Sequence, residues 1–347
     1  MAYTTIDNPE LFFQTKLYTG SGSAQSITFD GSEDMRPDWV WLKSRGGEGH
    51  RVHDSVRGVV NSLQPDGQEA QETAAISSFD SNGFSFDSGS DGNSSAGAYN
   101  SYVSWCWKAG NSSGSSNTDG SVTSTVSAST ASGFSIARFT GTGSNLTIGH
   151  GLGVKPDFII LKCDSSGSTD WTCYHSSLGA TKRIKLNANE AASTNSTTWQ
   201  DTEPTTSVIS VGTSGDVNVS SGTHIVYSFA NKQGAVKCGS YTGNGDADAP
   251  FIYTGFKPAI VILKETSTTS QWYIFDNKRD TFNLMTDAVF PDLANAETTD
   301  NAIDFLSNGF KGRKTSSDLN TDGNTHIYIA FAESPFVNSN GVPNNAR

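Results

Sequence analysis

The chain has little charge, few cysteines and no long apolar segment, and each shortage excludes a class of protein. Charged residues make up 17% of the 347 residues, and the formal net charge is −12, with no run of Lys or Arg. Such a surface repels phosphate backbones, so we expect no nucleic-acid partner. No segment approaches 18 apolar residues, and the first residues lack a basic and then apolar leader. We therefore expect neither membrane insertion nor secretion.

The four cysteines match neither a zinc site nor a secreted disulfide framework. Cys163 and Cys173 could face each other across a hairpin, but without a secretory context the sequence favours free, buried thiols for them and for Cys106 and Cys238. G-x-S-x-G, H-E-x-x-H and phosphate-cradling glycine motifs are also missing from the sequence. We expect no metal, no cofactor and no enzymatic activity.

The residues that are abundant indicate strands. Hydrophobic residues are only 35% of the chain, aromatic residues are 10%, and Gly, Ser, Thr and Asn are plentiful. This composition is typical of many short strands joined by polar turns, because helices are richer in Ala, Leu, Glu and Lys. The sequence therefore predicts an all-β fold.

Three signals recur three times in the same order, which predicts three copies of one module. Each copy has an aromatic strand with a Gly-rich turn (17–22, 138–143, 240–245), an apolar strand that begins with Pro and ends with Lys (37–43, 156–162, 258–264), and a closing apolar strand (102–105, 226–229, 328–331). Pro suits the first position of a strand, and an unbroken apolar run indicates a strand covered on both faces. We expect the closing Lys to return its charge to water.

The repeat predicts three tandem β-sandwich or jelly-roll-like domains behind a short N-terminal arm. The segment between the first two copies is nearly all Ser, Gly, Thr and Asn, which is typical of a flexible linker. The predicted divisions are an attachment arm (1–16), repeat 1 (17–110), the linker (111–132), repeat 2 (133–238), repeat 3 (239–335) and a C-terminal tail (336–347).

Four segments of the first copy carry a family resemblance: Met1–Asp7, Pro37–Lys43, His50–Gly58 and Trp105–Gly110. Residues 1–110 resemble a family of virion structural proteins from tailed bacteriophages of marine bacteria, including cyanophages and pelagiphages. The resemblance implies a virion component encoded near tail genes. It transfers no catalytic residue, and it is weaker in copies two and three.

Alignment of the copies separates one tryptophan from the others. Trp39, Trp41 and Trp105 align with apolar residues and are expected in the core. Trp107 aligns with Asn231 and Glu333, which favour water, so we expect Trp107 near the surface. There it would be an interface residue or a ligand platform, or it would contact the linker or a neighbouring domain.

Three other features of the sequence are candidate sites. Phe12 and Phe13 in the arm would either fix the arm to the first copy or dock it on another virion protein. Asp318–Gly323 resembles the start of a calcium loop, but Ile329 stands where the bidentate Glu should be, so a plain turn is favoured. His50–Asp54 alternates like a structural strand, which argues against an acid–base role.

These observations predict a tail-associated fibre or spike protein for host attachment. It would be made in the host cytoplasm, located in the virion and assembled as a homo-oligomer, with a trimer favoured. Its partners would be other virion proteins, bound through the arm, and a host surface glycan. The alternatives are a capsid decoration or head-fibre protein and a glycan depolymerase, since paired carboxylates need not be close in the chain.

Overall fold

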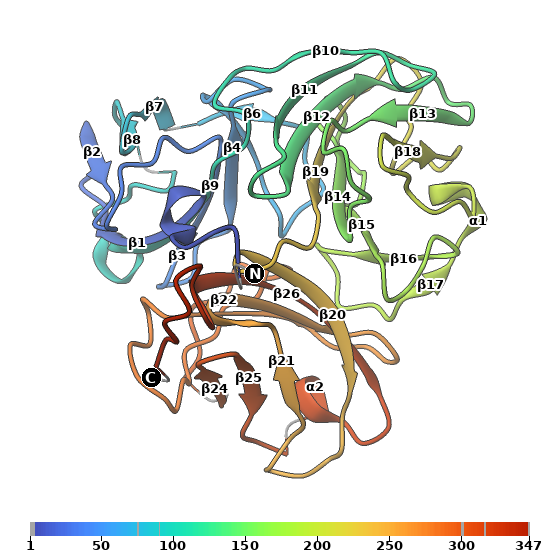
Figure 1. Cartoon of the computed structure of the whole chain (residues 1–347). Coiled ribbons are helices and arrows are strands. Elements are labelled where there is room, and N and C mark those ends of the chain that lie inside the picture. Colours follow the sequence, from blue (N-terminus) through green and yellow to red (C-terminus); the bar gives the residue numbers. More distant parts are fainter. Residues whose placement is uncertain (1–3, 75, 90, 300–301, 316, 346–347) are drawn as a thin grey trace.

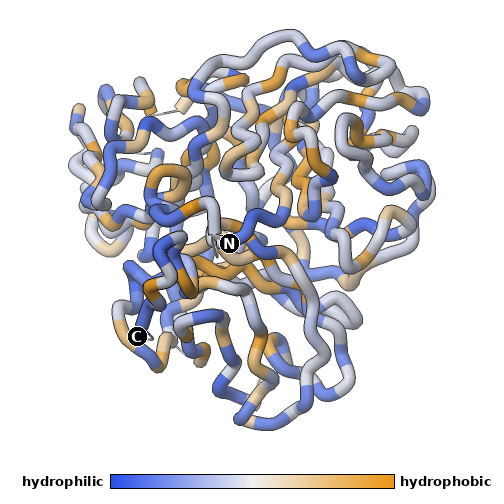
Figure 2. Tube along the Cα trace, in the orientation of Figure 1, coloured by the Kyte–Doolittle hydropathy of each residue, from blue (hydrophilic) through white to orange (hydrophobic). Residues whose placement is uncertain are grey.

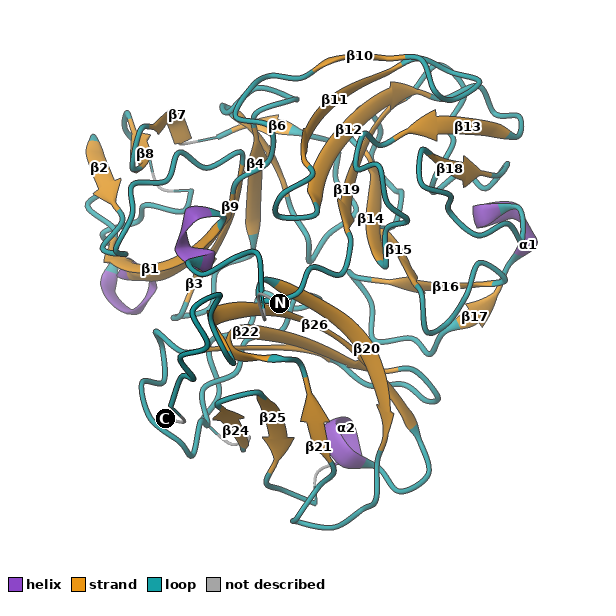
Figure 3. Cartoon of the chain, viewed as in Figure 1, coloured by secondary structure: helices purple, strands orange, loops and turns teal. Residues whose placement is uncertain are grey.

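The chain folds into three β-rich lobes around a common centre (Figure 1). The computed structural model describes residues 4–74, 76–89, 91–299, 302–315 and 317–345. Figure 3 shows strands in every lobe and only short helical turns, which are η1 (Pro9–Leu11), η2 (Gly97–Asn100), α1 (Ser196–Trp199) and α2 (Ser317–Asn320). The all-β prediction is confirmed. No helix in the described part of the chain is long and apolar enough to cross a membrane.

Each lobe contains one large antiparallel sheet, and four strands follow the same order in all three. In module 1 the order is β1 (Phe13–Thr19), β9 (Ser101–Trp107), β3 (Trp39–Ser44) and β4 (Arg51–Asp54), extended by β5 (Asn61–Leu63) and β6 (Glu72–Thr73). In module 2 it is β12 (Phe134–Thr140), β19 (Thr223–Phe229), β14 (Phe158–Cys163) and β15 (Thr172–His175), extended by β16 (Lys182–Lys185) and β17 (Ser193–Thr194). In module 3 it is β20 (Val236–Thr242), β26 (Thr325–Pro335), β22 (Phe256–Glu265) and β23 (Trp272–Asp276).

A smaller antiparallel sheet covers the outer face of each large sheet, so every module is a two-layer sandwich. The small sheets are β2 (Gln25–Thr28), β8 (Gly83–Phe86) and β7 (Ile76–Asp80) in module 1, β13 (Leu146–Gly149) and β18 (Val208–Val211) in module 2, and β21 (Phe251–Tyr253), β25 (Gly309–Gly312) and β24 (Ile303–Leu306) in module 3. A local hydrophobic core lies between the two layers of each sandwich.

Strand β3 shows why the Pro-anchored strands are apolar throughout. Successive side chains of a strand point to opposite faces. Trp39 and Trp41 enter a core shared by all three modules, whereas Val40 and Leu42 enter the local core of module 1. Both faces are therefore covered, as the unbroken apolar run predicts.

The shared core is centred on three equivalent aromatic residues, Trp107, Phe229 and Phe331. Each pairs with the residue that lies two positions after the anchoring Pro of its module. Their ring centroids are 5.4 to 6.3 Å apart in all three pairwise combinations. Hydrophobic stretches appear in the strands that converge on this centre (Figure 2). The modules are therefore related by an approximate threefold axis and do not form a row.

The segment predicted as a flexible linker is part of module 2, so that prediction is wrong. It contains β10 (Ser115–Asn117) and β11 (Ser124–Ser129), and β11 pairs with β12 over five residues. Val126 is 8% exposed and packs into the local core, while its neighbours are Ser and Thr. Because a sheet-edge strand can be built from polar, β-branched residues, composition alone does not distinguish it from a linker.

The described parts of the arm and of the tail both lie on the body. β1 begins at Phe13, four residues before the predicted start of repeat 1. The carboxylate of Asp7 in the arm accepts hydrogen bonds from the backbone N–H (2.7 Å) and hydroxyl of Ser339 in the tail. The arm and the tail are thus joined to each other on the surface of the body.

The closing lysines of the Pro-anchored strands are buried, contrary to the prediction that they return to water. Lys43, Lys162 and Lys264 are each 0% exposed. Their ammonium groups donate to backbone carbonyls, and Lys43 and Lys162 reach carbonyls of a neighbouring module, those of Ala294 and Gln68. Burial lowers the pKa of each of the three lysines to about 8.

Candidate functional site

Charged residues form polar contacts at the boundaries between the modules. In module 1, Asp54 at the end of β4 accepts hydrogen bonds from Arg57 Nε (2.5 Å) and from the Tyr227 hydroxyl of module 2 (2.7 Å). The side chains of Asp54 and Arg57 are both fully buried. Burial alone would lower the pKa of Arg57, but the adjacent carboxylate outweighs it and raises that pKa.

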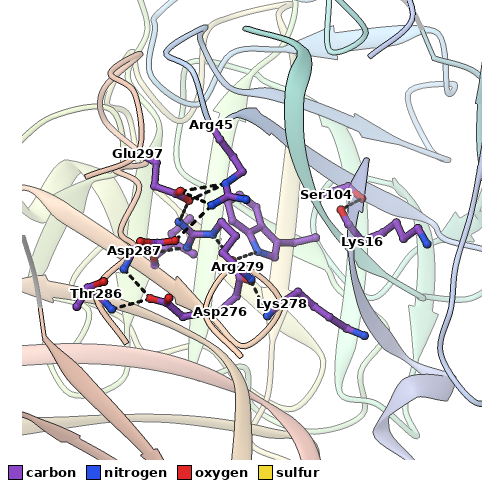
Figure 4. Close-up of polar contacts among 12 residues, drawn as sticks. Lys16, Arg45, Ser104, Asp276, Lys278, Arg279, Thr286, Asp287 and Glu297 are labelled. Atoms are coloured by element: carbon purple, nitrogen blue, oxygen red, sulfur yellow. Dashed lines mark hydrogen bonds and ion pairs between the residues drawn. The ribbon is translucent and has the colours of Figure 1, made fainter. Parts of the chain in front are cut away.

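Module 3 repeats this arrangement against module 1. Asp276 accepts hydrogen bonds from Arg279 Nε (2.5 Å) and from the indole N–H of Trp105 (3.1 Å). Figure 4 shows Arg279 and Arg45 converging on Glu297, at 2.9 and 2.5 Å respectively. Two arginines from different modules therefore share one carboxylate at this boundary.

Module 2 makes the equivalent contact without a buried ion pair. His175 occupies the place of Asp54 and Asp276, and its Nε2 lies 3.1 Å from the backbone carbonyl of Tyr328 in module 3. Burial lowers the pKa of His175 to about 4, so the imidazole is neutral near pH 7 and Nε2 carries the donated proton. The three contacts run in one direction around the axis, from module 1 to 2, 2 to 3 and 3 to 1.

These groups hold the modules together and are out of reach of a substrate. Asp54, Asp276 and His175 are at most 1% exposed, and their hydrogen-bonding atoms are directed at protein partners. Buried charges are retained in proteins when they are paired and hydrogen-bonded, as they are here. The carboxylates at the module boundaries are therefore part of the scaffold.

Trp107 is not at the surface, so the expected interface or ligand platform is wrong. It is 2% exposed and lies on the approximate threefold axis. The sequence alignment was displaced by two residues: the structural counterparts of Trp107 are Phe229 and Phe331, not Asn231 and Glu333. A two-residue shift keeps a strand on the same face, so it left Trp105 in the core. It matched Trp107 with Asn231, which follows the end of β19, and with Glu333, which lies near the end of β26.

The two phenylalanines of the arm pack against the body, which is the first of the two predicted alternatives. Phe13 is 5% exposed, and its ring centroid is 5.0 Å from that of Trp107 and 5.3 Å from that of Phe331. Phe12 is half-buried against the same core. The arm therefore closes one end of the shared core, and it leaves only a cavity of about 10 Å³ there.

The remaining sequence candidates are structural. Asp318, at the start of the calcium-like sequence, accepts hydrogen bonds from Ser270 (2.9 Å) and Tyr273 (2.8 Å), and no metal-binding group of His, Cys, Asp or Glu occurs among the described residues. His50 accepts a hydrogen bond from the Trp41 indole (2.8 Å), and His53 contacts the Val59 carbonyl. The four cysteines are free and buried.

A groove on the outer surface of module 3 has a different character, and sequence reasoning missed it. It has a volume of about 310 Å³, and we call it the outer groove. It is lined by Asn231, Lys232, Gln233, Val236, Lys237, Tyr253, Thr254 and Gly255. Tyr253 is 58% exposed, and the nearby Phe251 is 47% exposed. An alignment of the small-sheet strands would have found both aromatics, because the other modules have polar residues or glycine there.

A larger open groove of about 440 Å³ lies on module 1, and its lining combines the aliphatic Val60, Ala74 and Ile76 with polar residues and the acidic Asp87 and Asp91. Among its described lining residues there is neither an aromatic ring nor a cation. The outer groove of module 3 is therefore the better candidate for binding.

Comparison with known proteins identifies a family but no characterised relative. Neither a curated protein nor a solved structure matches the chain. Residues 8–335 match a single family model, described as "Domain of unknown function (DUF7483)". The match runs from the arm through all three modules, in agreement with their shared core. The chain therefore belongs to the DUF7483 family.

Proposed function

We propose that this protein is a structural component of a bacteriophage virion, a tail-associated appendage that contributes to host attachment and has no enzymatic activity. The observation that carries the proposal is the position of its polar and aromatic groups. Asp54, Asp276 and His175 are buried at module boundaries, whereas Tyr253 and the outer groove face solvent. A rigid body with an exposed groove that is lined by an aromatic ring is suited to binding. The resemblance of residues 1–110 to marine phage virion proteins supplies the setting.

The compact arrangement of the modules bears on which part of an appendage this protein would form. Three modules in a row would have given reach, but three modules around one core give a rigid, rounded unit (Figure 1). Such a unit suits the tip of a fibre or a short spike better than a shaft. Because the shared core is filled within one chain, copies in the proposed homotrimer would contact one another through outer surfaces. Repetition of a weak site in an oligomer raises avidity.

Location on the particle tests the proposal. A small tag fused to the C-terminus would be labelled with gold and imaged on purified phage, and we expect the label at the tail. Label on the head would replace the proposal with a capsid decoration or head-fibre protein. Mass spectrometry of the same particles is the control, and absence of the chain from them would refute both versions.

Two solution measurements test the rest of the proposal. Light scattering should give three times the chain mass of 36.8 kDa, and a monomer would exclude the trimer. Incubation with host surface polysaccharide should leave the length of the polysaccharide unchanged. Shortened chains would favour a depolymerase over a non-enzymatic attachment protein.

A further inference from the structure

The three modules provide an internal comparison for the outer face of the small sheet. Phe251 and Tyr253 of β21 flank the buried Ile252 and point outward. The residues at equivalent positions are Ser26 and Thr28 in module 1 and Thr147 and Gly149 in module 2, given by the pairing of each small sheet. The fold therefore does not require aromatic residues at these positions. Module 3 alone exposes two rings there.

Two glycines, Gly309 and Gly255, lie next to these rings. Gly309 lies opposite Tyr253 in the adjacent strand, and a Cβ at Gly309 would be 2.9 Å from the ring of Phe251, so this ring leans over the glycine. A Cβ at Gly255 would be 3.5 Å from the Tyr253 hydroxyl, so a side chain there would lie against the tyrosine. The backbone itself requires both glycines: a Cβ at Gly309 would lie 2.0 Å from the Ile252 carbonyl oxygen, as one at Gly83 would from that of Ile27 in module 1, and Gly255 has a φ of +82°. The two rings, and not the glycines, therefore distinguish module 3.

The charge of the outer groove is opposite to that of the whole chain. Lys232 and Lys237 line it, and among the described lining residues there is no Asp or Glu. Neither lysine has an ion-pair partner within the described ranges. Charges farther away than about 10 Å are largely screened at physiological ionic strength. One carboxylate lies beside the groove, that of Asp157 in module 2, which accepts a hydrogen bond of 2.8 Å from the Asn231 N–H. It offsets part of the charge of the two lysines, so the groove keeps only a small positive charge, although the chain has a net charge of −12.

We propose that the outer groove binds an anionic sugar residue of a surface polysaccharide, one that carries a carboxylate or a sulfate. The apolar C–H face of the sugar ring would lie on Tyr253, because the face of an aromatic ring is apolar and carries partial negative charge. Its acidic group would accept charge-assisted hydrogen bonds from Lys232 and Lys237. A volume of about 310 Å³ is at the lower end of the range for ligand sites, which suits one or two sugar rings. This inference rests on the proposed attachment role and names its ligand class.

The backbone at the groove argues for a sugar over an acidic peptide. An extended peptide would bind by adding a strand to a sheet edge, and β20 and β21 are both edge strands at the groove. Residues 231–232 occupy the start of the β20 edge: Lys232 and Val236 exchange backbone hydrogen bonds of 2.9 and 3.0 Å, and the Asn231 side chain accepts from the Cys238 N–H at 2.6 Å. A sugar needs no such backbone partners.

Binding to immobilised polysaccharides tests the inference. The probes are polygalacturonate for carboxylate, dextran sulfate for sulfate, unmodified dextran as the neutral control and polyglutamate as the acidic peptide. We expect the full chain to bind at least one charged polysaccharide at least tenfold more tightly than dextran and polyglutamate. Tyr253→Ala, and separately Lys232→Glu combined with Lys237→Glu, should each weaken that binding at least tenfold.

Matched surface variants control for unspecific effects. Phe282 is 77% exposed and Lys182 is exposed, and both are outside the outer groove. Phe282→Ala and Lys182→Glu should bind as the unchanged chain does. Equal binding to dextran, no binding to either charged polysaccharide, or losses shared by the control variants would overturn the inference. Preferential, Tyr253-dependent binding to polyglutamate would replace the sugar with an acidic peptide.

The two proposals can fail separately. If the chain is on the tail and phage carrying Tyr253→Ala adsorb normally, the attachment role survives and the groove has no part in it. If polysaccharide binding depends on Tyr253 but the chain is absent from particles, the groove is a sugar site and the virion role is wrong.

Discussion

Replacing Asp54 by Asn tests whether the buried ion pairs join the modules. The carboxylate of Asp54 accepts four hydrogen bonds: two from the backbone N–H groups of Val56 and Arg57 (2.9 and 2.7 Å), one from Arg57 Nε and one from Tyr227. An amide of the same shape removes the negative charge and directs an NH₂ group at donors. Arg57 then remains buried and uncompensated. Breaking a buried pair in this way costs about 3–5 kcal/mol of unfolding free energy.

Module 2 supplies the matched control. It has His175 and Leu178 where module 1 has Asp54 and Arg57. The double variant Asp54→His with Arg57→Leu removes both charges, and with them Arg57 Nη1, a buried atom that has no hydrogen-bond partner in the described structure. Removing both partners of a buried pair is much less costly than removing one. The double variant should therefore be more stable than Asp54→Asn by at least about 1.5 kcal/mol.

Urea unfolding at pH 7, followed by far-ultraviolet circular dichroism, measures both differences. Because the three modules share one core, each protein should show a single transition, and its midpoint should move without separation of one module from the others. The reasoning fails if Asp54→Asn loses less than about 1 kcal/mol, or if the double variant is no more stable than the single one.

Two further predictions follow from buried residues whose environment the sequence did not reveal. Trp107→Ala should lower the unfolding free energy by about 3–5 kcal/mol, because it empties the centre of the shared core. Phe282→Ala should change the unfolding free energy by less than about 0.5 kcal/mol. Equal effects of the two variants in urea unfolding would contradict the position of Trp107 on the axis. Lys162→Met should change the pH dependence of the unfolding free energy, because the pKa of Lys162 is about 8 in the folded chain and higher in the unfolded chain. In the unchanged chain, the free-energy penalty for burying the ammonium group is complete below pH 8. It is relieved as the pH rises and the folded chain loses this proton. The advantage of the methionine variant should therefore shrink by about 2.5 kcal/mol between pH 7 and pH 10, and a constant difference would show that the lysine does not lose its proton in this range.

The fold class and the repeat could be predicted because they depend on local patterns. The unbroken apolar strand after each Pro predicts burial on both faces, and Trp39 and Trp41 are in the core as expected. Which module covers the second face of each of these strands could not be predicted. A strand covered by its own module and a strand covered by another module have the same apolar pattern. The approximate threefold arrangement therefore left no trace in the periodicity.

Register was the step at which prediction of the site failed. Trp107 matches Asn231 and Glu333 when the closing segments are aligned by their last aromatic residues, Trp105, Phe229 and Phe331. The structure instead aligns these strands by their pairing with the Pro-anchored strands. The shift by two preserved the alternation of faces, so nothing in the apolar pattern revealed it. The buried lysines were missed for a related reason. A lysine at the end of a strand is ordinarily solvated, and only the approach of a neighbouring module supplies carbonyl partners such as that of Ala294 to Lys43.

The approximate symmetry also separates scaffold from function by a physical criterion. At the axis the three modules have Trp107, Phe229 and Phe331, which differ in identity but are all buried aromatics, because a small or a polar residue there would leave a cavity or an unpaired polar group in the shared core. On the outer small sheets no such constraint acts, and polar residues can stand there without loss of stability. Module 3 departs from that pattern with Tyr253, which is exposed beside two lysines. The exposed ring contributes nothing to the core, which agrees with the sugar site that we propose for module 3.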